Sequence, residues 1–438
     1  MPTKKITMDY HETIDYLFNL QKYGIKLGLL NITQMLEALQ NPHKHFQTVH
    51  VAGTNGKGST AAMVASILQA HGFSVGLFVS PHMVRFTERI SINNVEIPQE
   101  EVVRLTNVIR DSIHQIPDLT PTFFEFVTAM AFVYFKEKGI DWAIIETGMG
   151  GRFDSTNVIS PEVSIITHIS EDHKQFLGDT IEKIAYEKAG IIKPYIAVVC
   201  SYQESEVLEV LSNKATETSS TLALYGQDFK ALNIGNMIFD YYGINKIQNI
   251  KLSLAGKHQI ENASCAIRAF ECLNINIDVD LIKKALLNLK WAGRCESIHH
   301  KGKHYILDGG HNYQALYRLR EFLLEDNALK KIILIYGAMS DKDNRKMLNI
   351  IAPIARKIIF TAPSYGRAEN PAILKDLANL PVDTKSYVTN NVKEAICLLD
   401  KIYESGELIV VTGSFYTVGE VKELFGEPTL LKSLTEFK

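Results

Sequence analysis

The sequence has no long apolar run anywhere, and none near its start. The longest, 123–135, is interrupted by Glu125 and Thr128 and is well short of the roughly 20 residues that span a bilayer. The first twelve residues contain no apolar run of the kind that a signal peptide requires. We therefore expect a soluble, cytoplasmic protein with no membrane partner.

Cysteine is scarce, and neither charge is in excess. The five cysteines are odd in number and include no C-x-x-C pair, which fits neither a disulfide framework nor a zinc ribbon. With 46 Lys and Arg against 49 Asp and Glu, the net charge of −3 gives no bulk attraction to nucleic acid. The 438 residues, 46% of them hydrophobic, are too many for one compact core. We expect about two to three folded domains and no binding of nucleic acid, and we take a monomer as the default.

Short β-rich runs alternate with helical patterns over most of the chain. This alternation predicts parallel βαβ units and therefore an α/β fold. Between about 207 and 254 the pattern changes to short strands with turn residues, which predicts a small β insertion, and a helical pattern returns over 258–272. The β-rich runs before the insertion are 47–53, 74–80, 140–146 and 163–169.

A second alternating series begins after Glu296. We place a domain boundary there, so that the expected domains cover residues 1–296 and 297–438. The β-rich runs of this second series are 304–309, 331–337, 357–361 and 407–413.

The segment 53–60 reads GTNGKGST and lies between an apolar strand and a helix. Glycines let backbone N–H groups turn toward phosphate oxygens, the helix start adds its positive dipole end, and Lys57 adds a charge. The spacing differs from the standard G-x-x-x-x-G-K-S/T loop because only two residues separate Gly53 from Gly56 and Gly58 follows Lys57. A glycine-rich turn without a ligand is the alternative. The combination favours a P-loop ATPase-type first domain with a mainly parallel sheet, followed by a smaller Rossmann-like domain.

Two polar residues that follow strands could hold divalent ions. Glu146 ends an apolar run before glycines, and the carboxyl end of a parallel strand faces the ligand crevice of such sheets. Mg²⁺ in a nucleotide site needs only one or two protein oxygens besides phosphates and waters. His173 follows the run 163–166, and a neutral imidazole could ligate a second ion. If each residue is considered alone, Glu146 could instead be a solvated acid at a strand end, and His173 a surface or capping histidine.

Four further residues carry weaker signals when they are considered alone. Asp308 ends a strand before glycines, which suits a ribose or phosphate contact. Arg294, near the domain boundary, could bind phosphate in an interdomain cleft. Asn262 has the position of a helix-start polar group, and Lys188 that of a solvated helix lysine ahead of a glycine.

As a set, these motifs resemble those of the folylpolyglutamate synthase and dihydrofolate synthase family, within the Mur ligase superfamily of ATP-dependent amide-bond ligases. Gly58 between Lys57 and Ser59 resembles the folate branch, whereas the peptidoglycan ligases usually run Gly-Lys directly into Thr or Ser. Two residues depart from the family's pattern, Gly310 where Ala is common and Phe153 where Leu is common, and neither removes a functional group. The resemblance spans nearly the full chain and is carried by segments 53–59, 80–90, 122–126, 146–157, 172–178, 186–194, 291–296, 308–312 and 411–419.

The resemblance implies a role for each group of residues. The catalytic residues would be Lys57, Lys188 and His311, with Lys188 matching the lysine that the superfamily carbamylates. His311 and Ser414 would lie on the glutamate side. Magnesium, at two sites, would be held by Ser80, Glu146 and His173. The pterin or folate would contact Thr122, Phe123, Phe124, Glu125, Phe153, Asp154 and Ser155. ATP would be bound by Asn55, Gly56, Lys57, Gly58, Ser59, Thr60, Asn262, Arg294 and Asp308.

The activity that the resemblance implies is ligation of L-glutamate to dihydropteroate, to a reduced folate, or to both. ATP would first convert the acceptor carboxylate to an acyl phosphate, and residues 1–296 and 297–438 would form the ATP-binding central domain and the glutamate-ligase domain. The segments 122–125 and 153–155 favour both activities. One alternative is a Mur-type cell-wall ligase for a UDP-linked muropeptide, against which Gly58 and segment 80–90 argue. Another is a non-catalytic, nucleotide-regulated binding protein.

Overall fold

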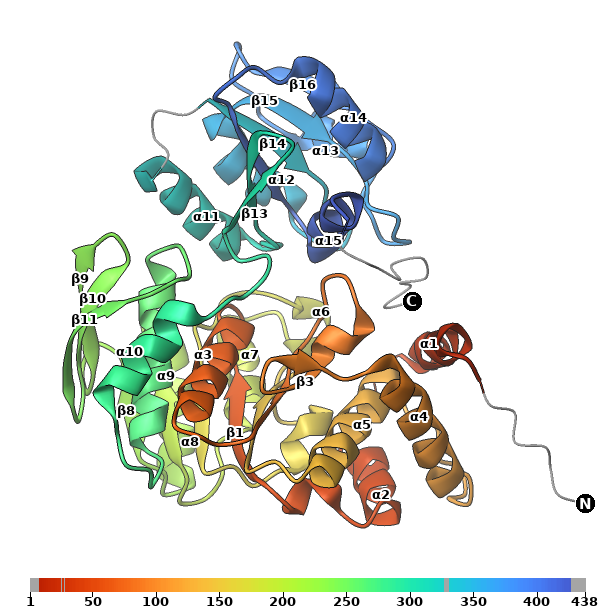
Figure 1. Cartoon of the computed structure of the whole chain (residues 1–438), viewed down its shortest axis with the longest axis vertical. Coiled ribbons are helices and arrows are strands. Elements are labelled where there is room, and N and C mark those ends of the chain that lie inside the picture. The colour runs from red at the N-terminus through yellow and green to blue at the C-terminus, as the bar shows by residue number, and fades with distance from the viewer. Residues whose placement is uncertain (1–7, 25, 27, 327–330, 427–438) are drawn as a thin grey trace, which may run out of the picture.

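The computed structural model describes residues 8–24, 26, 28–326 and 331–426 of the chain. It contains an eight-stranded sheet, a three-stranded sheet and a six-stranded sheet. The eight-stranded sheet with its helices occupies one end of the molecule and the six-stranded sheet the other (Figure 1). Within the described ranges, no helix is both long and apolar enough to cross a membrane.

The eight-stranded sheet has the order β4-β3-β2-β5-β1-β6-β7-β8 and places β1 between β5 and β6. Neighbouring strands are parallel except for β3, which is antiparallel to β2 and β4. This confirms the mainly parallel sheet that the alternating pattern predicts. The strands are β1 (Gln47–Ala52), β2 (Val75–Phe78), β3 (Ile90–Ile92), β4 (Val95–Glu96), β5 (Trp142–Glu146), β6 (Val163–Ile166), β7 (Ala197–Cys200) and β8 (Leu222–Leu224).

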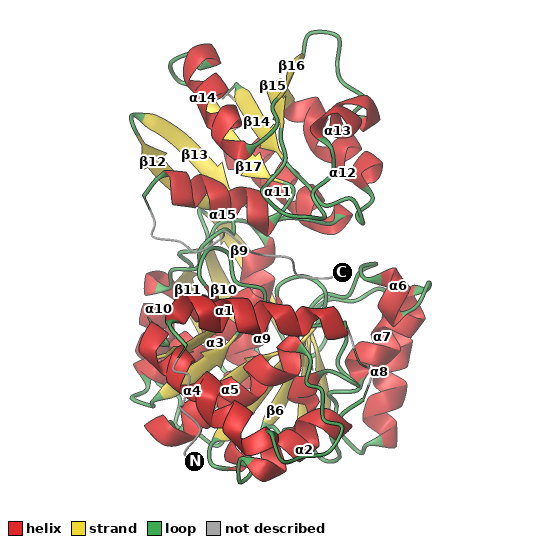
Figure 2. Cartoon of the chain, turned by 90° about the vertical axis from the view of Figure 1, so that its right-hand side faces the viewer, coloured by secondary structure: helices red, strands yellow, loops and turns green. Residues whose placement is uncertain are grey.

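Helices cover both faces of this sheet. One face packs against α3 (Lys57–Ala70), α9 (His258–Glu271) and α10 (Val279–Asn288). The other face, turned toward the viewer in Figure 2, carries α1 (Tyr10–Asn19), α2 (Leu30–Ala38), α4 (Gln99–Ile113) and α5 (Phe123–Lys138). The remaining helices of this part are α6 (Lys174–Leu177), α7 (Ile181–Ala189) and α8 (Ser205–Glu217), with the 3₁₀ turns η1 (Leu20–Tyr23), η2 (Pro42–Lys44), η3 (Phe86–Arg89) and η4 (Ser155–Val158).

Helix α3, which follows the glycine-rich loop, is buried along most of its length. It lies between the sheet and the pair α9 and α10, so nearly all of its side chains between Gly58 and Leu68 are buried. Ser66 Oγ donates to the carbonyl oxygen of Ala285 at 3.1 Å, a residue 219 positions later. The helix is therefore held in place by distant parts of the chain.

A three-stranded antiparallel sheet lies beside α9 and α10 at the margin of the molecule (Figure 1). Its strands are β9 (Lys230–Gly235), β10 (Ile238–Tyr242) and β11 (Lys246–Lys251), which confirms a small β insertion. The expectation that short strands begin at about 207 was wrong, because helix α8 extends to Glu217 and the strands β8 to β11 follow it. Val207, Leu211 and Ala215 recur every four residues and are buried on one face of α8.

The six-stranded sheet forms the second α/β unit, with hydrophobic clusters on both faces. Its order is β12-β13-β17-β14-β15-β16, and only the pair β12 and β13 is antiparallel. This confirms the smaller Rossmann-like fold. The strands are β12 (Glu296–His300), β13 (Lys303–Leu307), β14 (Ile332–Tyr336), β15 (Ala355–Phe360), β16 (Lys385–Val388) and β17 (Leu408–Thr412). The helices are α11 (Tyr313–Asp326), α12 (Asn344–Ile351), α13 (Pro371–Leu377), α14 (Val392–Ile402) and α15 (Phe415–Leu424), with η5 (Ala352–Ile354).

Candidate active site

The glycine-rich loop joins β1 to α3 and requires glycine at two positions. Gly53 has a φ of +146°, and a Cβ there would lie 1.9 Å from Thr167 Oγ1. Gly56 has a φ of +92°, and a Cβ there would lie 2.5 Å from Asn262 Oδ1. Helix α3 begins at Lys57, so its first backbone N–H groups lack intrahelical acceptors and carry the positive end of the helix dipole. This geometry suits an anion such as a phosphate.

Lys57, Glu146 and Ser80 come together at the start of α3. Glu146, at the end of β5, is 4% exposed, and its Oε1 lies 3.8 Å from Lys57 Nζ. The backbone N–H of Ser80 donates to Glu146 Oε2 at 3.1 Å. Burial raises the pKa of Glu146, although the charge of Lys57 opposes this shift. A buried carboxylate of this kind favours a nearby cation, and the structure thus brings together two of the three residues predicted to bind magnesium.

The third predicted ligand, His173, lies in a cluster around Asp172. His173 Nε2 and His311 Nε2 are each 3.8 Å from Asp172 Oδ2, and Lys342 Nζ donates to Asp172 Oδ1 at 2.7 Å. Burial would raise the pKa of Asp172, but His173, Lys342 and His311 outweigh it and hold that pKa well below its usual range. Burial lowers the pKa of His173 to about 4, so its imidazole is neutral at pH 7 and able to ligate a metal.

The donor set fits magnesium better than it fits a metal held by protein alone. In the described ranges, no three His, Cys, Asp or Glu side chains gather closely enough to hold a metal ion. Mg²⁺ usually keeps several waters and takes one or two carboxylates together with phosphate oxygens. Glu146 and the Ser80 hydroxyl meet that smaller requirement beside the phosphate loop.

Lys188, on α7, is a buried lysine and not the solvated one that its local pattern suggests. It is 4% exposed, and its Nζ donates to the carbonyl oxygen of Gly53 at 2.7 Å. Burial, followed by the charge of Lys57, lowers the pKa of Lys188 to about 7. A substantial fraction of Lys188 is therefore a neutral amine at physiological pH, directly behind the phosphate loop.

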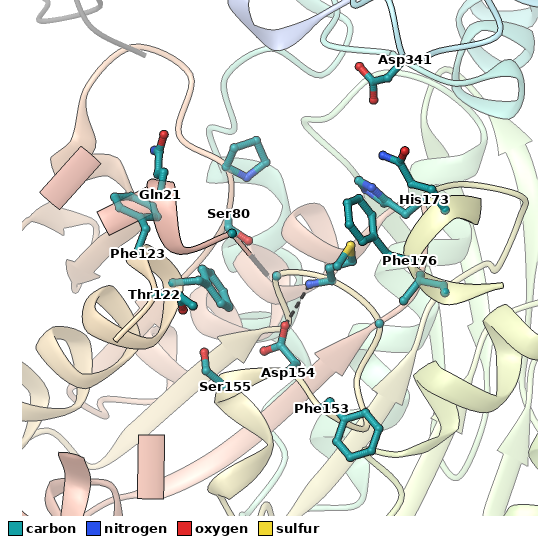
Figure 3. Close-up of a pocket in the computed structure, with 18 of the residues that line it drawn as sticks. Gln21, Ser80, Thr122, Phe123, Phe153, Asp154, Ser155, His173, Phe176 and Asp341 are labelled. Atoms are coloured by element: carbon teal, nitrogen blue, oxygen red, sulfur yellow. Dashed lines mark hydrogen bonds between the residues drawn. The ribbon is translucent and has the colours of Figure 1, made fainter. Parts of the chain in front are cut away.

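The residues predicted for the acceptor line one cavity of about 280 Å³ between α5, the loop after β5 and the six-stranded sheet. Figure 3 shows Thr122 and Phe123 on one side, Asp154 and Ser155 below them, and His173 on the side of Asp341. His311 and Ser414, predicted for the glutamate side, also line it. Lining residues that the sequence analysis missed include Gln21, Arg89, Met149, Phe176, Asp341, Lys342, Arg367 and Tyr416.

Three of these predicted residues take part in helix caps. Thr122 and Glu125 form the capping box of α5, in which Thr122 N–H donates to Glu125 Oε2 at 2.7 Å. The hydroxyl of Ser414 accepts from Thr417 N–H at 3.1 Å and caps α15. Each therefore orients the helix start at the cavity wall, whatever further contacts it makes.

The residues predicted on the nucleotide side connect the two large sheets. Asn55 and Asn312 exchange side-chain hydrogen bonds of 3.4 and 3.0 Å between the phosphate loop and the loop after β13. Asp308 accepts from the N–H of Cys295 at 3.0 Å, and burial raises its pKa while Arg294 opposes this. The Arg294 guanidinium lies 4.5 Å from the ring centre of Phe415.

The other predicted nucleotide residues lie at the start of α3, except Asn262, which lies on the neighbouring helix α9. Gln259 Nε2 donates to Ser59 Oγ at 3.5 Å, and Gln259 Oε1 accepts from Asn262 Nδ2 at 2.9 Å. Thr60 Oγ1 is buried without a hydrogen-bond partner among the described residues. A Cβ at Gly58 would lie 3.3 Å from both Glu146 Oε2 and Trp291 Cζ2, so a side chain here would require these neighbours to shift.

Comparison with known proteins identifies related chains over nearly the full length. Residues 51–270 match the Mur ligase middle domain, and residues 293–415 match the Mur ligase glutamate ligase domain. The chain is 34% identical to the dihydrofolate synthase/folylpolyglutamate synthase of Bacillus subtilis over 94% of this chain and 98% of that protein.

Two solved structures extend the comparison. The folylpolyglutamate synthase from Thermotoga maritima aligns with a TM-score of 0.84 and 35% identity, covering 95% of this chain and 96% of that one. The E. coli FolC structure in complex with DHPP and ADP aligns with a TM-score of 0.88 and 26% identity, covering 96% and 99%.

Proposed function

Because the chain belongs to the folylpolyglutamate synthase and dihydrofolate synthase family of Mur ligases, and is thus an ATP-dependent ligase that joins L-glutamate to folates, we propose that it accepts both dihydropteroate and reduced folates. Segments 122–125 and 153–155, which resemble those of enzymes with dihydropteroate activity, support this proposal because they line the same cavity as Ser80. The N–H of Ser80 bonds to Glu146 beside the phosphate loop, and the same residue lines the acceptor cavity. An acceptor in this cavity could therefore bring its carboxylate to the phosphate site.

The reaction that these residues suit has two steps. The acceptor carboxylate attacks the γ-phosphorus of ATP, forms a carbon–oxygen–phosphorus link and releases ADP. The amine of L-glutamate then attacks the acyl carbon, inorganic phosphate leaves, and the nitrogen loses a proton to give the amide. Lys57 and the N–H groups at the start of α3 offset the charge on the transferring phosphoryl group. Closure of the two domains around the site would keep water from the acyl phosphate.

We assign magnesium to Ser80, Glu146 and His173, at two sites. Bound with ATP, magnesium would neutralise phosphate charge as the phosphoryl group is transferred. Glu146 and the Ser80 hydroxyl offer oxygen ligands for one site. The neutral imidazole of His173 offers a nitrogen ligand for the other.

We propose that Lys188 is carbamylated. A lysine must be neutral to take up carbon dioxide, and its pKa of about 7 meets that condition. The carbamate would place a negative charge near the second magnesium ion. We expect Lys188→Ala to lose activity and a short carboxylate to restore part of it; normal activity in Lys188→Ala would exclude the carbamate.

The first experiment measures phosphate release with Mg-ATP and L-glutamate in the presence of dihydropteroate, of tetrahydrofolate, or of neither. Release with both acceptors is the expected result. Release with only one would name a single activity and overturn the dual assignment. Release with neither, but with a UDP-muropeptide, would indicate a cell-wall ligase, whereas ATP binding without any release would indicate a binding protein.

Two controls accompany this measurement. Lys57→Ala, purified in the same way, detects phosphate release by contaminating ATPases. Size-exclusion chromatography tests the monomer that we propose.

We also propose that residues 1–296 and 297–438 act as the ATP-binding and glutamate-ligase domains.

A further inference from the structure

Three side chains connect the central strand β1 to the acceptor cavity. His50 Nε2 lies 2.8 Å from Thr156 Oγ1, and Thr156 Oγ1 donates to Asp154 Oδ1 at 2.6 Å. His50 and Thr156 are fully buried, while Asp154 reaches the cavity wall. Neither His50 nor Thr156 has a part in the mechanism described above.

Strand alternation explains why His50 faces this way. Val49 and Val51 belong to the cluster that packs against α3, so His50, between them, points to the opposite face of the sheet. The turn η4, which carries Thr156, lies on that face. Burying a polar ring in an apolar strand costs free energy unless the ring is hydrogen-bonded. Packing alone therefore does not account for a histidine here.

The chemistry of the groups sets the direction of these hydrogen bonds. An ionised carboxylate only accepts hydrogen bonds, so the Thr156 hydroxyl donates to Asp154 and leaves its lone pairs for His50. His50 must then donate from Nε2, and its Nδ1 carries no hydrogen. Nδ1 is buried without a hydrogen-bond partner among the described residues, as this tautomer allows. Burial lowers the pKa of His50 to about 3, so the ring is neutral.

Asp154 joins two segments of the cavity wall. Its Oδ1 also accepts from Thr156 N–H at 3.0 Å, and its Oδ2 accepts from Met149 N–H at 2.9 Å, a bond drawn in Figure 3. The carboxylate thus connects η4, which begins at Ser155, to the loop that follows β5.

The loop after β5 in turn lies close to an aromatic wall of the cavity. A Cβ at Gly148 would come within 2.6 Å of the Phe124 ring, so the loop and the ring are in close contact. A change in the orientation of Asp154 would therefore shift several walls of the cavity together.

We propose that His50 is a positioning residue for the acceptor, because its Nε2–H holds the Thr156 hydroxyl in the orientation that fixes Asp154 and the cavity wall. This inference rests on the proposed function, since it takes the cavity as the acceptor site. The effect acts on acceptor binding and leaves the phosphate loop untouched. The KM for the acceptor should therefore respond to loss of this hydrogen bond, and the KM for ATP should not.

Matched substitutions distinguish the effect of losing the hydrogen bond between residues 50 and 156 from the effect of changing the residue itself. The amide nitrogen of Gln can reach the position of His50 Nε2, whereas that of Asn reaches only the position of Nδ1. Thr156→Ser keeps the hydroxyl, and Thr156→Val removes it at similar size. We expect the KM for dihydropteroate to rise about tenfold in His50→Asn and Thr156→Val and to change less than about threefold in His50→Gln and Thr156→Ser. The KM for ATP should stay unchanged in all four variants.

His43→Asn serves as the control. His43 also has a buried Nδ1 without a partner among the described residues, and it packs against Phe132 with ring centres 5.9 Å apart. Its substitution should leave the KM for dihydropteroate unchanged. Thermal unfolding of every variant identifies any that fail to fold; if His50→Asn does, the pair Thr156→Val and Thr156→Ser gives the same comparison.

Equal acceptor KM values in His50→Asn and His50→Gln would overturn the positioning role. An equal rise in the KM for ATP and for the acceptor would also overturn it, because that result indicates general damage. If the wild-type enzyme uses no folate acceptor, the proposed function fails and this inference fails with it. If the wild type is active and His50→Asn has the same acceptor KM, only the positioning role fails.

Discussion

Lys342 Nζ lies 2.7 Å from Asp172 Oδ1, so an ion pair joins the loop after β14 to the loop after β6. The two residues belong to different sheets and stand 170 positions apart. Lys342 lines the acceptor cavity, and Asp172 is largely buried beside His173 and His311. The pair therefore sets how the two halves of the candidate site face each other.

Replacing Lys342 with Met should lower turnover at least about tenfold and the free energy of unfolding by about 1–3 kcal/mol, because a buried carboxylate loses its only full positive partner among the groups named above. Phosphate release and urea unfolding measure the two effects. Lys303→Met is the control: Lys303 pairs with Asp400 at 2.6 Å, but the Asp400 side chain is 51% exposed. That pair should contribute under about 1 kcal/mol. Wild-type turnover in Lys342→Met would contradict the role of the pair.

Lys57→Ala and Glu146→Ala should each abolish turnover and leave thermal unfolding nearly unchanged. Glu146 is a buried carboxylate whose pKa burial raises, so its removal relieves an unfavourable charge and costs the fold little. Phosphate release and thermal unfolding test the two expectations. Lys174→Ala, which removes a lysine from an exposed pair with Glu171, should keep full activity. Activity retained in either site variant would exclude the role assigned to that residue.

Lys188→Met should stabilise the protein at pH 6 while removing its activity. The pKa of Lys188 is about 7 in the folded chain, whereas an unfolded lysine titrates near 10.4, so between these values the unfolded state binds more protons. The wild-type free energy of unfolding therefore gains a contribution from Lys188 as pH rises from about 7 toward 10. The Met variant lacks this gain.

Urea unfolding in CO₂-free buffer tests the sign of this effect. We expect Lys188→Met to exceed the wild type by about 1–3 kcal/mol at pH 6 and by clearly less at pH 9. The same difference at both pH values would show that Lys188 does not lose its proton in this range.

Gly148→Ala should raise the KM for the acceptor and leave the KM for ATP unchanged. The new Cβ would lie 2.6 Å from the Phe124 ring, so the ring or the loop must shift, and both line the cavity. Steady-state kinetics with each substrate varied in turn measures the split. At Gly366 a Cβ would meet nothing within 4 Å, and Gly366→Ala should behave as wild type. An unchanged acceptor KM in Gly148→Ala would place the acceptor ring away from Phe124.

The elements with strong local patterns were predictable from the sequence. The apolar run before Gly53 predicts a buried strand that ends at a glycine turn. The structure has this strand as β1, and Gly53 adopts a positive φ directly after it. The stretch from Val207 was misjudged although its buried residues recur every four positions, because this helical spacing was overlooked beside the turn-rich strands that follow it. The acceptor residues came from the family resemblance, since no periodicity marks them.

The long-range contacts could not be predicted because they depend on how elements dock. Nothing near Lys342 in the sequence indicates that it will face Asp172 across the site. Lys188 has the local pattern of a solvated helix lysine, and only the packing of α7 behind the phosphate loop buries it. His50 sits within an apolar strand, and its hydrogen bond to Thr156 exists only because η4 lies against that strand.

The packing of α3 also has a consequence for synthesis on the ribosome. The helix is translated early, but the residues that cover it, including Ala285, follow more than 200 codons later. Until α9 and α10 emerge, the apolar side chains that α3 turns toward them are exposed on the nascent chain and are open to chaperones or to aggregation. Helix α3, which follows the phosphate loop, is therefore fully covered only when about two-thirds of the protein has been made.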